Sequence, residues 1–206
     1  MTRVCFLSYT HPYYDTRILH REAHSLAAND YDVFHVAPSA ENGNLTVENV
    51  KIVLYSTRPG WFGRIRRFFT LYRRGVELNA DIYHCNEIAS WLVGCAIKLF
   101  HRQKRVIFDV HEHYPSRFEE PRFPVFLKWL GKPLIHTLYW ILTPWTDHLI
   151  FAKRSVAPDF PFSSGKSTYV FNYGIIQKGQ KTLQDVDSSV RDEFANLKTA
   201  IHVGSF

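Results

Sequence analysis

Short apolar runs alternate along this chain with longer segments of helical periodicity. The runs are continuous in hydrophobicity, which is typical of strands covered on both faces of a parallel sheet. They predict strands at residues 4–7, 33–36, 52–55, 82–84, 106–110, 148–151 and 168–171. Between these runs, the apolar spacing predicts helices at residues 16–29, 61–78, 88–100 and 124–142.

This alternation predicts an α/β fold, a Rossmann-like parallel sheet flanked by helices. In such sheets ligands bind in the loops beyond the carboxyl ends of the strands. Those loops cover residues 9–15, 85–87, 111–122 and 172–175. Asp15 is the expected N-cap of the first helix. The loop before it, residues 10–14, contains no glycine, which excludes the dinucleotide-binding fingerprint.

The end of the chain indicates a domain boundary. The first domain is expected to cover residues 1–176, followed by a polar linker and short helix at residues 177–198. Residues 199–206 have the pattern of a new strand. That strand either opens a second, truncated domain or adds to the edge of the first sheet. We expect a second domain, because nothing after this strand could pair with it.

The segment at residues 61–76 combines an aromatic face with an arginine-rich face. On a helical projection, Trp61, Phe68 and the neighbouring apolar residues fall within one arc of about 120°. The remaining surface carries Arg64, Arg66, Arg67, Arg73 and Arg74. This pattern fits a helix lying on an anionic membrane surface. The alternative is an amphipathic helix packed on the sheet with solvated arginines. The apolar stretch at residues 123–145 forms either a second membrane-facing patch or a core helix interrupted at Pro133.

Charge and cysteine content restrict the kinds of ligand and the cellular compartment that fit this chain. The net charge is +6, but seven basic residues and no acidic one lie between residues 51 and 76. A nucleic-acid-binding surface needs basic charge spread over a face, so we expect no nucleic acid and a single anion-facing patch. The three cysteines lie in apolar segments without metal-ligand spacing, which fits a reducing cytosol. His20 and His24 have the helical spacing of metal ligands but no third ligand, so we expect both to be solvated.

A succession of short motifs follows the order found in a known family. They lie at residues 11–18, 22–26, 31–33, 81–84, 108–115, 146–150, 170–173 and 201–206. Among them are an Asp-Thr-Arg opening at residues 15–17 and an Asp-Val-His-Glu sequence at residues 109–112. This succession resembles the N-terminal half of a retaining GT-B glycosyltransferase of the group 1 type, glycosyltransferase family four.

The resemblance implies two Rossmann-like domains facing each other across a cleft. The N-terminal domain would bind the acceptor, and the C-terminal domain would bind a nucleotide-diphosphate sugar as co-substrate. No cofactor or metal ion is implied. The family's donor-binding motifs lie further along than residue 206, so this fragment is expected to be inactive alone. Many relatives place two glycines in the first loop, where this chain has Tyr13 and Tyr14.

The same resemblance assigns roles to residues at the strand ends. His111 matches a cleft histidine that lines the reactive sugar, although a structural histidine closing the strand end is the alternative. Asp15 and Arg17 either contact acceptor or phosphate at a helix start, or form a cap and a surface ion pair. Glu87 and Glu112 either contact substrate or are solvated or arginine-paired carboxylates.

The sequence thus predicts the acceptor-binding domain of a glycosyltransferase of the hexosyltransferase type. The whole enzyme would transfer a sugar with retention to a polysaccharide or lipid-linked acceptor. Its expected location is the cytoplasm, peripherally on the inner face of the membrane. Two alternatives stay open, a non-catalytic membrane-anchoring subunit of a split glycosyltransferase and a sugar-phosphate epimerase of similar architecture.

Overall fold

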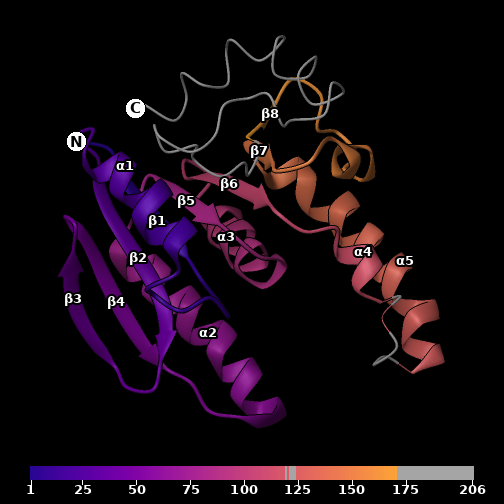
Figure 1. Ribbon diagram of the computed structural model, residues 1–206, viewed down its shortest axis with the longest axis horizontal. Helices are drawn as coiled ribbons and strands as arrows, with labels where there is room; N and C mark the ends of the chain where they lie inside the picture. The colour runs from indigo at the N-terminus through magenta and orange to yellow at the C-terminus, as the bar shows by residue number, and fades with distance from the viewer. Residues whose placement is uncertain (119, 121–123, 171–206) are drawn as a thin grey trace, which may run out of the picture.

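The computed structural model describes residues 1–118, 120 and 124–170. In this part of the chain one sheet has the strand order β3-β4-β2-β1-β5-β6-β7-β8 (Figure 1). Neighbouring strands are parallel except β3 and β4. The strands are β1 (Arg3–Leu7), β2 (Asp32–Ser39), β3 (Gly43–Val47), β4 (Val50–Ser56), β5 (Ile82–Cys85), β6 (Arg105–Val110), β7 (His148–Phe151) and β8 (Ser167–Tyr169).

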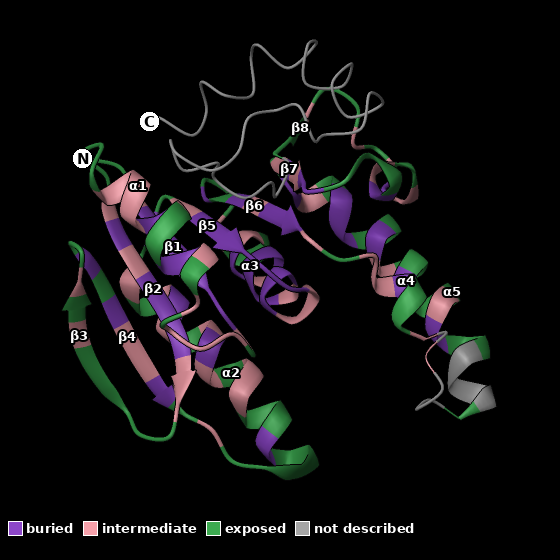
Figure 2. Cartoon of the chain, in the orientation of Figure 1, coloured by how far each residue is buried: buried purple, intermediate pink, exposed green. Residues whose placement is uncertain are grey.

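Helices cover both faces of the sheet. They are η1 (Thr16–Ala23), α1 (His24–Ala27), α2 (Gly60–Leu78), α3 (Ile88–Phe100), α4 (Tyr114–Arg117) and α5 (Val125–Leu142), with short helical turns η2 (Thr143–Trp145) and η3 (Arg154–Asp159). On β1, Val4 and Phe6 pack in a core with η1, whereas Cys5 and Leu7 join the core beneath α2, α3 and α5. Burial on both faces explains why the strands have continuous apolar runs (Figure 2).

Trp91 of α3 is the centre of the larger core. It is fully buried, and its ring stacks on Phe108 of β6 with centroids 4.2 Å apart. Its indole Nε1 donates a hydrogen bond of 2.7 Å to Thr146 Oγ1, so the polar end of the ring is satisfied. Truncation of such a residue to alanine typically costs about 3–5 kcal/mol.

The strand order places a topological switch point between β1 and β5. From β1 the chain moves outward to β2 and β4, and it then returns to β5 on the other side of β1. The connections that leave β1 and β5 therefore diverge, which opens a crevice beyond their carboxyl ends. Any ligand site of this domain is expected in that crevice.

The α/β fold and each of the predicted strands are confirmed, although residue 171 of the last strand lies outside the described residues. The sequence analysis missed β3. Residues Gly43, Asn44 and Thr46 of this strand are exposed, so it shows no continuous apolar run. Its antiparallel pairing with β4 turns at Glu48 and Asn49, whose φ angles of 50° and 64° match a type I′ hairpin.

The predicted single helix at residues 16–29 is wrong in form. The segment begins as the π-helix η1 and continues as the short α-helix α1, which ends at Ala27. The predicted helices at residues 61–78, 88–100 and 124–142 are confirmed. Pro133 does not interrupt α5, since Ile135 and Tyr139 anchor this helix in the core. The expected elements at residues 177–198 and 199–206 lie outside the described residues.

Helix α2 packs on the sheet over only part of its length. Leu71 and Gly75 are buried, and Phe68 is half-buried against the core. Nearer the N-terminus, Trp61 and Phe62 are 70% and 84% exposed. In its C-terminal half, α2 therefore packs its aromatic face on the sheet, which is the second of the two interpretations given for this helix. At the start of the helix that interpretation is wrong, because the aromatic side chains there are exposed.

Gly94 allows α3 to approach β5 closely. A Cβ atom at this position would lie 2.6 Å from the Sγ of buried Cys85. We predict that Gly94→Ala lowers the free energy of unfolding by about 1–3 kcal/mol, because overpacking outweighs the gain of about 1 kcal/mol in helix propensity. Urea unfolding would measure the change.

Gly43→Ala is the matched control, since a Cβ atom there meets nothing within 4 Å. Its free energy of unfolding should change by less than about 0.5 kcal/mol. Equal stability of the Gly94→Ala variant and the wild type would contradict the close packing of α3 on β5.

Candidate functional site

A cavity of about 460 Å³ opens beyond the carboxyl ends of β1, β5 and β6. It is lined by the loop between β1 and η1, the start of α3 and the segment that follows β6. The structure brings all five sequence-predicted site residues into its lining: Asp15, Arg17, Glu87, His111 and Glu112. The volume lies within the usual range for small-molecule sites.

Glu87 anchors the first loop to α3. It is the N-cap residue of α3 and forms a reciprocal capping box with Ser90. Its Oε1 accepts hydrogen bonds from the backbone N–H groups of Tyr9 and Thr10, both at 2.7 Å, and its Oε2 accepts one from the Thr10 hydroxyl. Both carboxylate oxygens are therefore engaged in holding the loop that borders the cavity.

Asp15 caps η1, as predicted. Its Oδ1 accepts hydrogen bonds from the backbone N–H groups of Arg17 and Ile18, at 3.0 and 3.2 Å, and its Oδ2 lies 3.1 Å from His11 Nδ1. Burial acts to raise the pKa of Asp15. The backbone donors and the charges of His11 and Arg17 outweigh burial and hold that pKa below its ordinary value.

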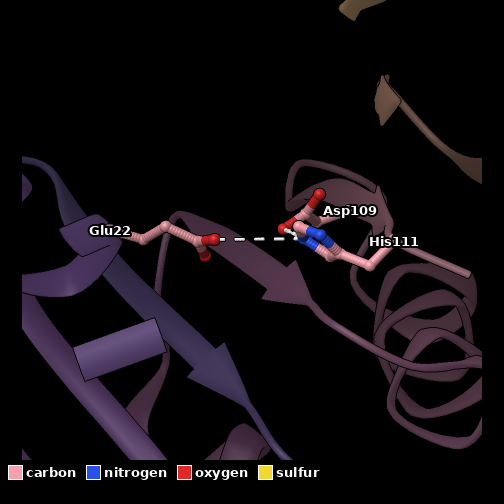
Figure 3. Close-up of side chains that lie close together, drawn as sticks. All are labelled: Glu22, Asp109 and His111. Atoms are coloured by element: carbon pink, nitrogen blue, oxygen red, sulfur yellow. Dashed lines mark hydrogen bonds and ion pairs between the residues drawn. The ribbon is translucent and has the colours of Figure 1, made fainter. Parts of the chain in front are cut away.

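A mostly buried charge network joins η1 to the end of β6, and Figure 3 shows three of its side chains, Glu22, Asp109 and His111. The side chain of Asp109 in β6 is 3% exposed, and its Oδ2 accepts a hydrogen bond of 3.1 Å from Arg17 Nη1. His111 Nε2 bonds to the same carboxylate oxygen. Glu22 Oε1 lies 3.8 Å from Arg17 Nη1 and 4.0 Å from His111 Nε2. The surface ion pair considered for Arg17 is wrong, since its partner Asp109 is buried.

The π-helical form of η1 lets Arg17 and Glu22 act together. In an α-helix, residues five apart point about 140° away from each other. A π-helix instead bonds residue i to residue i+5, which stacks such a pair on one face. Arg17 and Glu22 thus both face Asp109, although they lie on a helix that packs against β2 rather than β6.

Asp109 determines which nitrogen of His111 carries the hydrogen. An ionised carboxylate can only accept a hydrogen bond, so the neutral imidazole donates from Nε2 and keeps its lone pair on Nδ1. This Nδ1 is buried and has no hydrogen-bond partner among the described residues. Burial lowers the pKa of His111 to about 4, and the charge of Arg17 contributes in the same direction. The site therefore presents a neutral imidazole at pH 7.

The two carboxyl groups of this network share one guanidinium. Burial raises the pKa of Glu22 and the charge of Asp109 raises it further, to about 8. Burial also raises the pKa of Asp109, but the charge of Arg17 opposes it. Glu22 consequently holds a proton at neutral pH, while Asp109 balances Arg17. The buried network then carries no net charge, which limits the desolvation penalty.

The same three residues have the composition of a cation site. One ligand atom each from Glu22, Asp109 and His111 lies within 4.8 Å of the others. However, Arg17 Nη1 lies 3.1 Å from the Asp109 carboxylate and already supplies positive charge there. A metal ion would have to displace this guanidinium.

The segment after β6 has its own contacts. Glu112 is half exposed and its Oε2 lies 3.1 Å from Arg117 Nε, which matches the arginine-paired alternative. His113 caps α4, and its Nε2 lies 2.7 Å from Asp159 Oδ2. His113 therefore fixes the entry to α4 at the edge of the cavity.

Three residues of the site escaped the sequence analysis. Asp109 could have been found as a carboxylate inside an otherwise apolar strand, and Asn86 as a polar residue directly after one. Glu22 could not be recognised as a site residue from the sequence, because in an α-helix its side chain would point away from that of Arg17.

Helix α2 touches the cavity through Tyr9. The Tyr9 hydroxyl donates a hydrogen bond of 2.8 Å to the carbonyl of Arg64. The guanidinium of Arg67 lies 5.1 Å from the centre of the Tyr9 ring, and its Nη1 donates to the Tyr9 carbonyl at 3.3 Å. Arg73 and Arg74 instead pair with Glu77 at the other end of the helix.

Arg64 and Arg66 are exposed beside the exposed aromatics at the start of α2. Within the described part of the chain, every helix is too short or too polar to cross a bilayer.

Comparison with known proteins identifies relatives of this fold. The sequence model described as Glycosyltransferase Family 4 matches residues 16–160. Sucrose-phosphate synthase from Thermosynechococcus elongatus is similar in structure, with 10% identity, a TM-score of 0.56 and coverage of 83% of this chain and 48% of that chain. HepE from Anabaena, in complex with UDP and glucose, has 10% identity, a TM-score of 0.51 and coverage of 97% and 51%. The chain thus spans about half the length of these two proteins. No curated protein matches it significantly.

The proton on Glu22 makes stability depend on pH. A carboxyl group whose pKa is raised on folding stabilises the fold below its unfolded pKa, near 4.5, and this contribution is lost as pH rises through about 8. Glutamine mimics the protonated form. We predict that Glu22→Gln and the wild type have free energies of unfolding within about 1 kcal/mol of each other at pH 5, and that the variant is more stable by about 4 kcal/mol at pH 9.

Urea unfolding at both pH values would test this expectation. Glu41→Gln, at an exposed position, is the control and should differ from wild type equally at pH 5 and pH 9. A Glu22→Gln variant whose stability follows that of the wild type across the whole range would show that Glu22 is ionised in the fold.

Proposed function

Because this chain belongs to Glycosyltransferase Family 4, we propose that it is the acceptor-binding domain of an enzyme that transfers a sugar from a nucleotide-diphosphate sugar with retention. The observation that carries this proposal is that His111 lines the cavity at the switch point of the sheet and pairs with the buried carboxylate of Asp109. A neutral histidine with a fixed tautomer suits a reaction in which hydroxyl groups must be oriented.

In this proposal His111 is the catalytic residue. Its Nδ1 accepts a hydrogen bond from a hydroxyl of the reacting sugar or the acceptor. Asp109 holds the imidazole in its tautomer, and Arg17 holds Asp109. Asp15, Glu87 and Glu112 border the acceptor, with Glu87 acting by positioning the first loop. The low pKa of His111 keeps the imidazole an acceptor throughout the neutral range.

The donor would bind on the opposite side of the cleft. We propose that residues 1–176 form the acceptor domain, that residues 177–198 link it to a second domain, and that residues 199–206 begin that domain. HepE, which shares this fold, holds UDP and glucose, and this supports a nucleotide-diphosphate sugar as donor. A hexose as the transferred group and a polysaccharide or lipid-linked saccharide as acceptor are parts of the same proposal.

The start of α2 supports an acceptor held at a membrane surface. Trp61, Phe62 and Phe69 expose 63–84% of their surface, and Arg64 and Arg66 are exposed between them. Exposed aromatics next to arginines fit the headgroup region of an anionic bilayer. Because α2 contacts Tyr9, this surface borders the cavity. We propose a peripheral location on the cytoplasmic face of the membrane.

Replacement of His111 tests the catalytic assignment. With a panel of nucleotide sugars and the full-length protein, His111→Ala should lower kcat by about 10²–10⁴-fold, because the hydroxyl loses its acceptor. His20→Ala is the control, since His20 pairs with Glu48 away from the cavity. Unchanged turnover in His111→Ala would refute the assignment, and absence of sugar transfer by the wild type with every donor would refute the proposed function.

Charge reversal tests the membrane surface. The double variant Arg64→Glu/Arg66→Glu should lose at least about tenfold in affinity for vesicles with 30% phosphatidylglycerol, since each basic residue near such a surface contributes about 1 kcal/mol. Arg67 is left intact because it holds Tyr9. Co-sedimentation at low and high salt gives the affinity.

The control for this measurement is Arg21→Glu/Arg105→Glu, which makes the same change in net charge at exposed positions on η1 and β6. Its vesicle affinity should fall much less. Equal losses in the two double variants would mean that net charge, not the surface at the start of α2, drives the binding.

A further inference from the structure

Asn86 is a buried amide without a hydrogen-bond partner. It directly follows β5, is 2% exposed and belongs to the lining of the cavity. Neither its Nδ2 nor its Oδ1 bonds to another atom of the described residues. Buried polar groups in native proteins are nearly always hydrogen-bonded, because an unpaired amide loses its water without compensation. An amide kept unpaired in a cavity wall therefore points to a ligand that completes it.

The backbone around Asn86 is fixed by the start of α3. The N–H groups of Asn86 and Glu87 both lie 3.2 Å from Ser90 Oγ, which accepts from them. Glu87 is fixed further by the first loop. Only the side-chain torsions of Asn86 remain free to adjust, and the terminal torsion of asparagine is broad. The fixed backbone thus sets the place of the amide beside the cavity, and the side-chain torsions alone set its orientation.

The charges of the cavity select a neutral ligand. Its two arginines are already paired, Arg17 with Asp109 and Arg117 with Glu112. The lining also includes the carboxylates of Asp15 and Glu87. Among the described residues that line the cavity, a phosphate would meet these carboxylates, and both arginines are already engaged by other carboxylates. An amide that both donates and accepts matches hydroxyl groups, which do the same.

We propose that Asn86 binds hydroxyl groups of a saccharide in this cavity and thereby contributes to the selection of the acceptor. The proposal rests on the proposed function, since it names a residue that recognises the substrate of the same site. His111 Nδ1, which is also buried and unpaired among the described residues that line the cavity, is an acceptor only. Asn86 adds the donor that a hydroxyl oxygen requires.

The test combines stability with saccharide binding. The probes are the methyl α-glycosides of glucose, mannose and galactose, measured by saturation-transfer difference NMR and titration on the full chain. The variants are Asn86→Leu, which removes the amide but keeps the branched shape of the side chain, and Asn86→Asp, which replaces the amide donor by a carboxylate oxygen. Asn44→Leu, at an exposed position of β3, is the control.

We expect the wild type to bind at least one glycoside and Asn86→Leu to bind it at least about tenfold more weakly. At the same time, Asn86→Leu should melt at the wild-type temperature or about 2–4 °C above it, because an unpaired buried amide is removed. Asn86→Asp should weaken binding while Asn44→Leu leaves it unchanged. A clear fall in the melting temperature of Asn86→Leu would overturn the inference, because it would show that the amide is satisfied within the fold.

Binding by Asn86→Leu that equals wild-type binding, or absence of binding by the wild type, would also overturn it. The experiments distinguish failure of the proposed transferase function from failure of the proposed role of Asn86. Glycoside binding that depends on Asn86, without sugar transfer from any nucleotide sugar, refutes the transferase and supports this inference. Sugar transfer with an acceptor KM unchanged in Asn86→Leu supports the transferase and refutes this inference.

Discussion

The contact between Arg17 and Asp109 is the interaction on which the site depends. It joins η1 to β6, elements on opposite sides of the switch point, through a bond of 3.1 Å to a carboxylate that is almost fully buried. Loss of one partner in such a pair typically costs about 3–5 kcal/mol, because the other charge is left buried and unpaired. Removal of either Arg17 or Asp109 would therefore leave an uncompensated charge between η1 and the sheet.

The rest of the network follows from that pair. With one guanidinium available, only one carboxyl group is balanced, so Glu22 keeps its proton. Asp109 in turn fixes the tautomer of His111 and leaves Nδ1 as an acceptor. The fold maintains unpaired polar atoms on Asn86 and His111 at some expense of stability, as is common where a protein must recognise a ligand. In our proposal these atoms orient the hydroxyl groups of sugars.

Helix α2 contributes side chains both to the core and to an exposed surface. Its C-terminal half contributes Leu71 and Gly75 to the core, whereas its start exposes Trp61 and Phe62. Tyr9 connects this exposed start to the cavity through the carbonyl of Arg64. In our proposal, the membrane holds a lipid-linked saccharide at the entrance of the cavity. Tyr9 therefore lies between the proposed transferase site and the proposed membrane surface.

The pattern of apolar residues along the chain predicts the alternation of strands and helices, and hence the α/β fold, because burial on both faces leaves a continuous apolar run in most strands. It also placed Asp15, Glu87 and His111 at one edge of the sheet, since the carboxyl ends of parallel strands share an edge. Only the tertiary structure joined Arg17 to Asp109, which lie 92 positions apart, and turned Glu22 toward them. The π-helical winding and the strand order decide that contact, and neither leaves a periodicity that can be read along the chain.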